Sequence, residues 1–120
     1  MAGALFQPIL IVMLALAAAG SSQAQPAAPP PSVHGKALYL ADGCYQCHGV
    51  QGQGAGATGP RLAPEPIGLA YFTRQLRTPR DAMPVYTARV LPDGDLADIH
   101  AYLQSIPKPK AVSDIPLLNR

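Results

Sequence analysis

The chain has 120 residues, of which 13% are charged and 48% hydrophobic, and its formal net charge is +2 at pH 7. This length suits one compact domain and leaves no room for two domains of ordinary size. The small net charge and the absence of a basic run give no support to nucleic-acid binding. With 14 prolines, 11 glycines and 2 cysteines, the chain can bury only a modest core, which a large apolar ligand would help to complete.

Residues 1–24 are predicted to be an export signal that is cleaved. Residues 9–19 are apolar and uncharged, which matches the hydrophobic part of a signal peptide and falls short of the ~20 residues that a membrane-spanning helix needs. Ser22-Gln23-Ala24 is similar to a cleavage site, although no Lys or Arg precedes the apolar run. We therefore expect a periplasmic protein; the alternative is an uncleaved segment that anchors the domain to the membrane, facing the periplasm.

The chain after the signal is predicted to contain a linker, one folded domain and a C-terminal extension. Residues 26–31 consist of proline and alanine, which excludes a helix interior and favours an extended, semi-rigid spacer. The boundaries that we predict are 25–31 for the linker, 32–107 for the domain and 108–120 for the extension.

The predicted fold class is all-α, with three main helices joined by long loops. Residues 32–41 form the first expected helix with Ser32 as its N-cap, residues 67–78 the second, which ends before Pro79, and residues 93–105 the third. Such long loops around so few helices would be poorly packed without a bound group at their centre. The apolar positions expected to face the core are Leu69, Phe72 and Leu76 in the second helix and Leu96, Ile99 and Leu103 in the third.

The central motif is the sequence Cys-Tyr-Gln-Cys-His at residues 44–48, which matches the C-x-x-C-H pattern of covalent haem attachment. Cys44 and Cys47 lie on one helical turn, so each thiol can reach a vinyl group of the porphyrin. His48, the next residue, is then carried beneath the ring, where its imidazole can bind the iron. Five glycines within residues 49–60 predict an irregular loop directly after the motif.

Other interpretations of the two cysteines are weaker. A structural zinc site needs about four protein ligands, and beyond the motif the mature chain offers only His34 and His100, neither at a paired spacing. A thioredoxin-like site needs a βαβ context that is absent, and a simple disulfide would leave His48 unexplained. We expect His34 and His100 to be surface or boundary residues rather than iron ligands.

The second axial ligand is found by elimination. Met1 and Met13 lie in the predicted signal, which leaves Met83 as the one methionine of the mature chain. Pro84 restricts Met83 to extended conformations and so favours a fixed loop between the second and third helices. Filling a gap in the core is the commoner role for methionine, but the position of Met83 in this loop favours iron ligation.

From residue 32 to residue 107 the chain resembles a class I cytochrome c, a monohaem c-type cytochrome. The resemblance rests on motifs that occur in the family's order along most of the mature chain. These are Gly35 and Tyr39 in the N-terminal helix, the haem motif at residues 44–48, Gly59-Pro60 after the loop, Met83-Pro84, and Ile99 and Tyr102 in the C-terminal helix.

The resemblance implies a cytochrome c fold wrapped around one covalently bound haem c, with His48 and Met83 as the iron ligands. It implies that the first and last helices cross closely, so that Tyr102 packs against Gly35. It also implies that the Pro60 carbonyl accepts a hydrogen bond from His48 Nδ1–H, which fixes the ring and raises its basicity.

An iron with both axial positions filled has no open site for a substrate, so the predicted function is one-electron transfer without enzymatic activity. The expected partners are a periplasmic or membrane dehydrogenase as donor and an oxidase or other respiratory acceptor. The main alternative is a cytochrome subunit of a dehydrogenase or oxidase complex, and a haem sensor or peroxidase-like protein is a more distant one. The membrane becomes a partner only if residues 1–24 stay attached. Arg61 and Tyr71 are candidates for holding the haem propionates.

Charge is unevenly distributed along the domain. Residues 61–89 contain five Arg against two acidic residues, whereas residues 93–114 contain four Asp against two Lys. Because the Arg-rich segment includes Met83, we expect a weakly acidic partner to dock near this ligand. Reversing the charges of Arg74 and Arg77 should then slow electron exchange at low salt.

Overall fold

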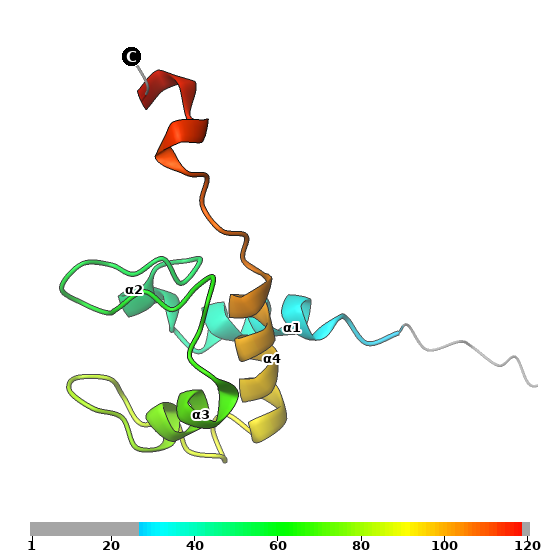
Figure 1. The fold of residues 1–120 in the computed structure, drawn as a ribbon. Helices are drawn as coiled ribbons and strands as arrows, with labels where there is room; N and C mark the ends of the chain where they lie inside the picture. The colour runs from blue at the N-terminus through cyan, green and yellow to red at the C-terminus, as the bar shows by residue number, and fades with distance from the viewer. Residues whose placement is uncertain (1–26, 119–120) are drawn as a thin grey trace, which may run out of the picture.

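The computed structural model describes residues 27–118, and this part of the chain is helical, with no strand. The predicted all-α fold class is therefore confirmed (Figure 1). The predicted signal peptide, residues 1–24, lies outside the described residues. The elements are α1 (Pro31–Ala41), α2 (Tyr45–His48), α3 (Leu69–Arg77), α4 (Asp93–Ser105) and the 3-10 turns η1 (Val112–Asp114) and η2 (Pro116–Leu118).

Two prolines, rather than a serine, start α1. Pro30 has extended backbone angles (φ −52°, ψ 146°), and its carbonyl accepts hydrogen bonds from the amides of Val33 and His34 at 2.9 and 3.0 Å. Pro31 occupies the first turn, where a helix leaves the N–H unpaired in any case and where the fixed φ of proline suits it. The prediction of Ser32 as the N-cap was therefore wrong.

The helices α1 and α4 cross at the centre of the domain and form its main helix contact (Figure 1). A Cβ atom built at Gly35 would lie 1.8 Å from the carbonyl oxygen of Asp98 and 2.7 Å from the amide nitrogen of Ile99, so this approach requires glycine. The close crossing expected from the resemblance is present, but the nearest neighbours of Gly35 are backbone atoms of α4 rather than the side chain of Tyr102. Tyr102 packs against Tyr39, with ring centroids 5.5 Å apart.

The helix α3 adds Phe72 and Leu76 to the core, where both are buried. Leu69, which was predicted to face inward, is 42% exposed. The reason is that the chain is still extended at Gly68 (φ −51°, ψ 144°), so Leu69 is the first residue of the helix. This helix begins two residues later and ends one residue earlier than predicted, whereas α4 has the predicted bounds.

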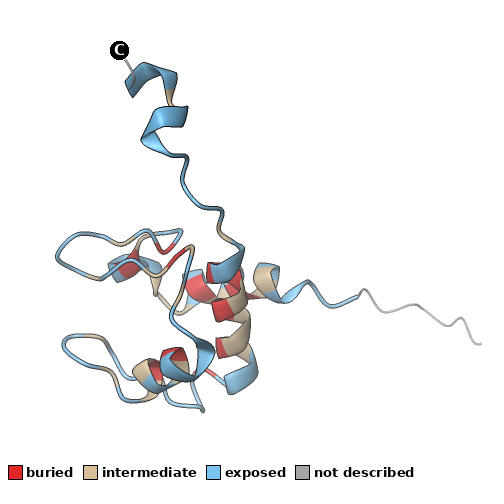
Figure 2. Cartoon of the chain, viewed as in Figure 1, coloured by how far each residue is buried: buried red, intermediate tan, exposed pale blue. Residues whose placement is uncertain are grey.

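Two loop regions project on the same side of the crossed helices (Figure 1). One contains α2 and the glycine-rich loop, and the other, residues 78–92, joins α3 to α4 and contains Met83. After α4, Ile106 packs against the core, whereas residues 107–118 run away from the domain and are mostly exposed (Figure 2). No helix within residues 27–118 is long and apolar enough to cross a membrane.

We predict that Gly35→Ala destabilises the protein by about 2 kcal/mol or more, because the added methyl group would overlap the backbone of α4. Gly94→Ala in α4 is a matched control, since a Cβ at Gly94 would have no neighbour within 4 Å. The control should change the free energy of unfolding by no more than about 0.5 kcal/mol, because Gly94 lies in the first turn of α4 and its substitution meets no neighbour. Urea denaturation of the holoprotein measures both effects. Equal effects of the two substitutions would contradict the close crossing.

Candidate functional site

The helix α2 is a single turn that brings the motif residues together. The amide of His48 donates to the Cys44 carbonyl at 3.0 Å, and Gly49, with a φ of 77°, ends the turn. Cys44 is half-buried, Cys47 is exposed, and both thiols are free. His48 is buried, at 8% exposure. The turn therefore presents two separate thiols and one enclosed imidazole on a short stretch of backbone.

One hydrogen bond fixes the ring of His48, whose Nδ1 lies 2.8 Å from the Pro60 carbonyl oxygen. Because a carbonyl can only accept, Nδ1 donates this hydrogen bond, and Nε2 is the ring nitrogen left to bind a metal. The contact expected between His48 and Pro60 is thus present. A Cβ at Gly59 would lie 2.5 Å from the Cys47 carbonyl oxygen and 3.0 Å from His48 Nδ1, so the chain reaches the ring because this residue is glycine.

Two core tyrosines hold the start of the glycine-rich loop. Tyr39 Oη donates to the Gly49 carbonyl at 2.7 Å, and Tyr102 Oη donates to the Val50 carbonyl at 3.0 Å. Burial raises the pKa of both phenols, so both stay protonated and can donate at pH 7. The packing of α1 against α4 thereby sets the position of the segment that follows His48.

Cys44 is not a reactive thiolate in this structure. Burial, and then the nearby charge of Asp42, raise the pKa of the Cys44 thiol to about 11, so it stays protonated at pH 7. The thiolate is the form that binds zinc or attacks a disulfide. Among residues 27–118, no three His, Cys, Asp or Glu side chains lie close enough together to hold a metal ion. The zinc and thioredoxin-like interpretations therefore gain no support.

Met83 lies in the loop between α3 and α4 and packs against the core. Its Sδ is 3.8 Å from Gln75 Nε2, a weak contact with α3. Asp81, two residues earlier, has a φ of 58°, in the left-handed region that Asp tolerates better than most side chains. Tyr86, three residues later, donates its amide to the Leu76 carbonyl at 2.9 Å. The methionine is therefore held between a tight turn and a backbone hydrogen bond to α3.

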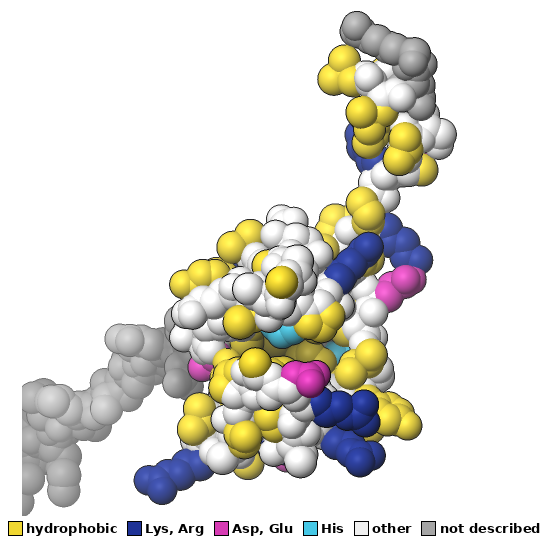
Figure 3. Space-filling model, turned by 90° about the vertical axis from the view of Figure 1, so that its left-hand side faces the viewer, with side chains coloured by type: hydrophobic (Ala, Val, Ile, Leu, Met, Phe, Trp, Pro, Cys, Tyr) yellow, Lys and Arg dark blue, Asp and Glu magenta, His cyan; other side chains and the backbone are white. Residues whose placement is uncertain are grey.

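The side chains of the two loop regions fit a haem. Figure 3, viewed from the side on which the loops project, shows a hollow between an upper and a lower lobe, with histidine and hydrophobic side chains at its floor. His48 offers its Nε2, Met83 offers a thioether from the other loop, and Cys44 and Cys47 offer two thiols on one turn. A nitrogen ligand, a sulfur ligand and paired thiols are the donor set of a haem c.

The other two histidines make structural contacts. His100 is only 6% exposed, and its Nε2 lies 2.8 Å from the Ile67 carbonyl oxygen. The prediction that His100 is a surface or boundary residue was therefore wrong, because this backbone acceptor lets the ring enter the core. His34 is half-buried and its Nδ1 lies 2.8 Å from Asp98 Oδ2, which links α1 to α4.

The two residues predicted to hold the propionates lie in different settings. Arg61 Nε donates to the Ala63 carbonyl at 2.7 Å, which stiffens the chain after Pro60. Tyr71 is 69% exposed on α3. Their role toward propionates stays a prediction.

Two residues around the Met83 loop were missed or misassigned from the sequence. Arg77, predicted to be part of a docking surface, turns inward and donates to two backbone carbonyls. Tyr86 Oη donates to the Asp42 carbonyl at 2.8 Å, which ties the Met83 loop to the end of α1. No sequence signal marks these contacts, because their acceptors are backbone carbonyls, which every residue carries.

The fold and the site together define a c-type cytochrome, a class of proteins that transfer electrons by means of haem. A family model described as cytochrome c oxidase, cbb3-type, subunit III matches residues 32–103. The match covers more than half of the chain, so the chain belongs to this family of cytochrome c domains, and the resemblance to class I cytochromes c is confirmed. No curated protein and no solved structure gives a significant match to the chain.

Asp42, at the end of α1 beside the motif, carries an unfavourable charge. Its Oδ2 is buried without a hydrogen-bond partner among the described residues. Burial, and then the negative charge of Asp95, raise the pKa of the Asp42 carboxyl. The folded protein therefore binds this proton more tightly than the unfolded chain does. As the pH rises from the ordinary Asp pKa through the raised one, ionisation of Asp42 costs stability.

We predict that Asp42→Asn raises the Tm of the holoprotein at pH 7, because the amide cannot ionise. The difference from wild type should disappear at about pH 3, below the ordinary range for Asp, where the wild-type carboxyl is protonated in both states. Asp114→Asn, in the exposed extension, is the control and should leave the Tm unchanged. Thermal unfolding across this pH range measures the effect; a gain in Tm that is independent of pH would rule out the charge as its cause.

Proposed function

We propose that this protein is a one-electron carrier in which Cys44 and Cys47 attach a single haem c, and His48 and Met83 bind its iron. The observation that carries the proposal is the His48 ring, enclosed in the domain and oriented by the Pro60 carbonyl so that Nε2 is free. The haem supplies the chemistry, a cycle between ferric and ferrous iron.

The protein's own residues control that chemistry in three ways. The hydrogen bond from His48 Nδ1 to Pro60 fixes the imidazole and increases its basicity as a ligand. With the haem bound, the Met83 thioether would raise the reduction potential relative to a second nitrogen ligand and would leave the iron no open site for a substrate. The contacts that hold the two loops keep both ligands in place in either oxidation state.

The first test of the proposed function is Met83→Ala in the holoprotein. The reduction potential should fall by on the order of 0.1 V, a part of the range of about 0.8 V that axial ligands span. The reduced variant should bind carbon monoxide, because one axial position is now open, whereas the wild type should not. Potentiometric titration and carbon monoxide titration measure the two effects.

Val85→Ala is the control, since Val85 lies in the same loop and is 59% exposed. It should behave like wild type in both titrations. Tight carbon monoxide binding by the wild type would favour the alternative of a haem sensor or a peroxidase-like protein. An unchanged potential in Met83→Ala would exclude Met83 as the ligand.

The partners in this proposal are redox proteins, a dehydrogenase as donor and an oxidase or other acceptor. Arg74 and Arg80 are exposed and line a pocket of about 580 Å³ that also includes Gln75, the neighbour of Met83. Figure 3 shows basic side chains gathered below one end of the hollow. An acidic partner surface would be attracted to this side of the molecule. Arg77, which was predicted from the sequence to share the docking surface with Arg74, is not part of this proposal because its guanidinium faces inward.

We expect the double variant Arg74→Glu/Arg80→Glu to slow oxidation by ferricyanide, a small anionic oxidant, about tenfold at low salt. The difference should shrink at high salt, where the charges are screened. Lys108→Glu/Lys110→Glu makes the same change in net charge on the C-terminal extension and is the control. Stopped-flow kinetics at two salt concentrations measure the rates; equal rates for the two double variants at low salt would remove the proposed docking site.

A second candidate function is that of a cytochrome subunit in an oxidase or dehydrogenase complex. The description of the matching family, a subunit of a cbb3-type oxidase, favours it. Purification of the tagged full chain from solubilised membranes distinguishes the two: a stoichiometric oxidase or dehydrogenase would support the subunit, and the cytochrome alone in the soluble fraction would support the carrier.

For the carrier we propose a periplasmic location, with residues 1–24 cleaved, residues 25–31 as linker, residues 32–107 as the haem domain and residues 108–120 as the extension.

A further inference from the structure

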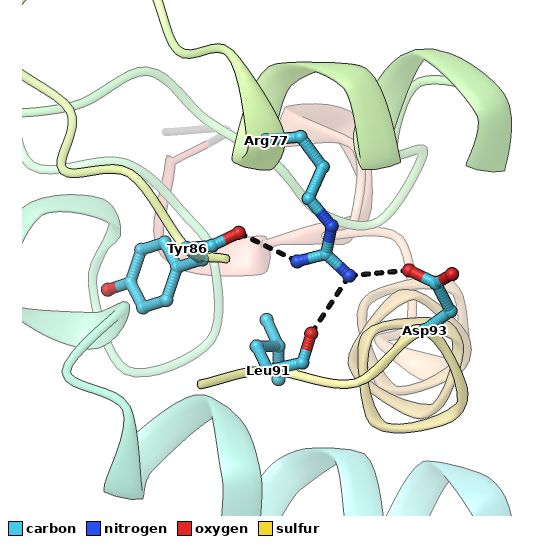
Figure 4. A network of polar contacts seen from close by, with 4 residues as sticks. All are labelled: Arg77, Tyr86, Leu91 and Asp93. Atoms are coloured by element: carbon cyan, nitrogen blue, oxygen red, sulfur yellow. Dashed lines mark hydrogen bonds and ion pairs between the residues drawn. The ribbon is translucent and has the colours of Figure 1, made fainter. Parts of the chain in front are cut away.

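Arg77, at the end of α3, connects several points of the Met83 loop that lie far apart in the sequence (Figure 4). Its Nη1 donates to the Tyr86 carbonyl at 2.7 Å, and its Nη2 donates to the Leu91 carbonyl at 2.8 Å. Nη2 also contacts Asp93 Oδ1, at the start of α4. One guanidinium therefore joins the last turn of α3, the far limb of the loop and the first turn of α4.

The position of this side chain differs from that of an ordinary arginine at the end of a helix. A basic residue in the last turn can interact with the helix dipole while it stays in water. The Arg77 side chain is instead only 20% exposed, and one of its acceptors belongs to Leu91, which is 1% exposed. A charge so far withdrawn from water needs partners, and the two carbonyls would in turn lose their donor without it.

The contacts of Arg77 limit the movement of Met83. Tyr86 follows Met83 by three residues, a length of at most about 11 Å of extended chain. Three hydrogen bonds hold Tyr86: its carbonyl accepts from Arg77, its amide donates to Leu76, and its hydroxyl donates to Asp42. The bond from Arg77 differs from the other two, because the same guanidinium also donates to the Leu91 carbonyl near the end of the loop.

We propose that Arg77 is a positioning residue for the methionine ligand, which keeps the loop of residues 78–92 closed so that Met83 stays on the iron and small ligands stay out. This inference rests on the proposed ligation by His48 and Met83. The planar fork of arginine can donate to two acceptors in different directions, whereas the ammonium of lysine acts as a point charge on a flexible stem. The geometry of the guanidinium, and not only its charge, is therefore required.

The test is the affinity of the ferric holoprotein for imidazole, which competes with Met83 for the iron. We expect Arg77→Met to bind imidazole on the order of tenfold more tightly than wild type, because two charge-assisted hydrogen bonds to the loop are lost. Arg77→Lys should also bind imidazole more tightly than wild type, but by a smaller factor than Arg77→Met. Asp93→Asn should stay within about twofold of wild type, because Asp93 is 79% exposed and an ion pair in water contributes little.

Two further variants calibrate the measurement. Arg89→Met makes the same chemical change in the same loop, at an exposed residue with no hydrogen bond or ion pair found within residues 27–118, and should bind imidazole like wild type. Met83→Ala sets the upper limit of affinity. If Met83→Ala binds imidazole no more tightly than wild type, the proposed ligation fails. If Met83→Ala binds tightly but Arg77→Met and Arg77→Lys match wild type, the positioning role alone fails.

Hydrogen exchange of backbone amides separates a local from a global effect. Opening of the loop should lower protection at the Tyr86 amide in Arg77→Met while α1 and α4 keep their protection. A uniform loss of protection in all helices of both Arg77 variants would show that Arg77 contributes to overall stability only, and would overturn the proposal. If Arg77→Met does not fold, imidazole affinity and hydrogen exchange are measured on Arg77→Lys instead. An imidazole affinity and a Tyr86 amide protection equal to wild type in Arg77→Lys would also overturn the proposal.

Discussion

The site depends on the contact between two backbones at the crossing of α1 and α4. Gly35 has no side chain, so α1 can lie directly on the carbonyl of Asp98 in α4. This approach brings Tyr39 and Tyr102 together, and their hydroxyls hold the carbonyls of Gly49 and Val50. The chain that leaves the haem motif is therefore anchored to the helix crossing, and a small shift of α1 against α4 would be transmitted to it.

A second set of contacts holds the other loop, and it shares few residues with the first. Met83 lies on a segment fixed by Arg77, by the Leu76 carbonyl and by the Asp42 carbonyl. The contact of Tyr86 with Asp42 is the point at which the two sets meet, because Asp42 ends α1 directly before the motif. Each proposed ligand is thus supported by its own network, which suits a site whose ligands must stay in place while its charge changes.

The sequence predicted the elements whose signals are local. The bounds of α4 followed from residue types at fixed spacings and were confirmed. The motif at residues 44–48 and Met83, the one methionine within residues 27–118, were found from equally local signals, and their role as haem ligands stays a prediction. Errors arose where two local signals competed. Pro31 overrode Ser32 as the start of α1, and the extended backbone at Gly68 left Leu69 at the exposed end of α3.

Contacts to distant backbone carbonyls could not be predicted from the sequence. His100 enters the core because the carbonyl of Ile67 is within reach, and Arg77 turns inward because the carbonyls of Tyr86 and Leu91 are. A carbonyl is present at every position, so only the folded chain determines which one lies opposite a given side chain. His100 and Arg77 were therefore expected at the surface, whereas in the folded chain both side chains turn inward.

The central claim of the proposal is that Met83 and His48 are the two protein ligands of the haem iron, and the absorption spectrum of the ferric holoprotein tests it most directly. The claim predicts a low-spin c-type spectrum with a weak far-red band from sulfur-to-iron charge transfer, present in the wild type and in Val85→Ala and lost in Met83→Ala. A high-spin wild-type spectrum, or a far-red band that persists in Met83→Ala, would contradict it.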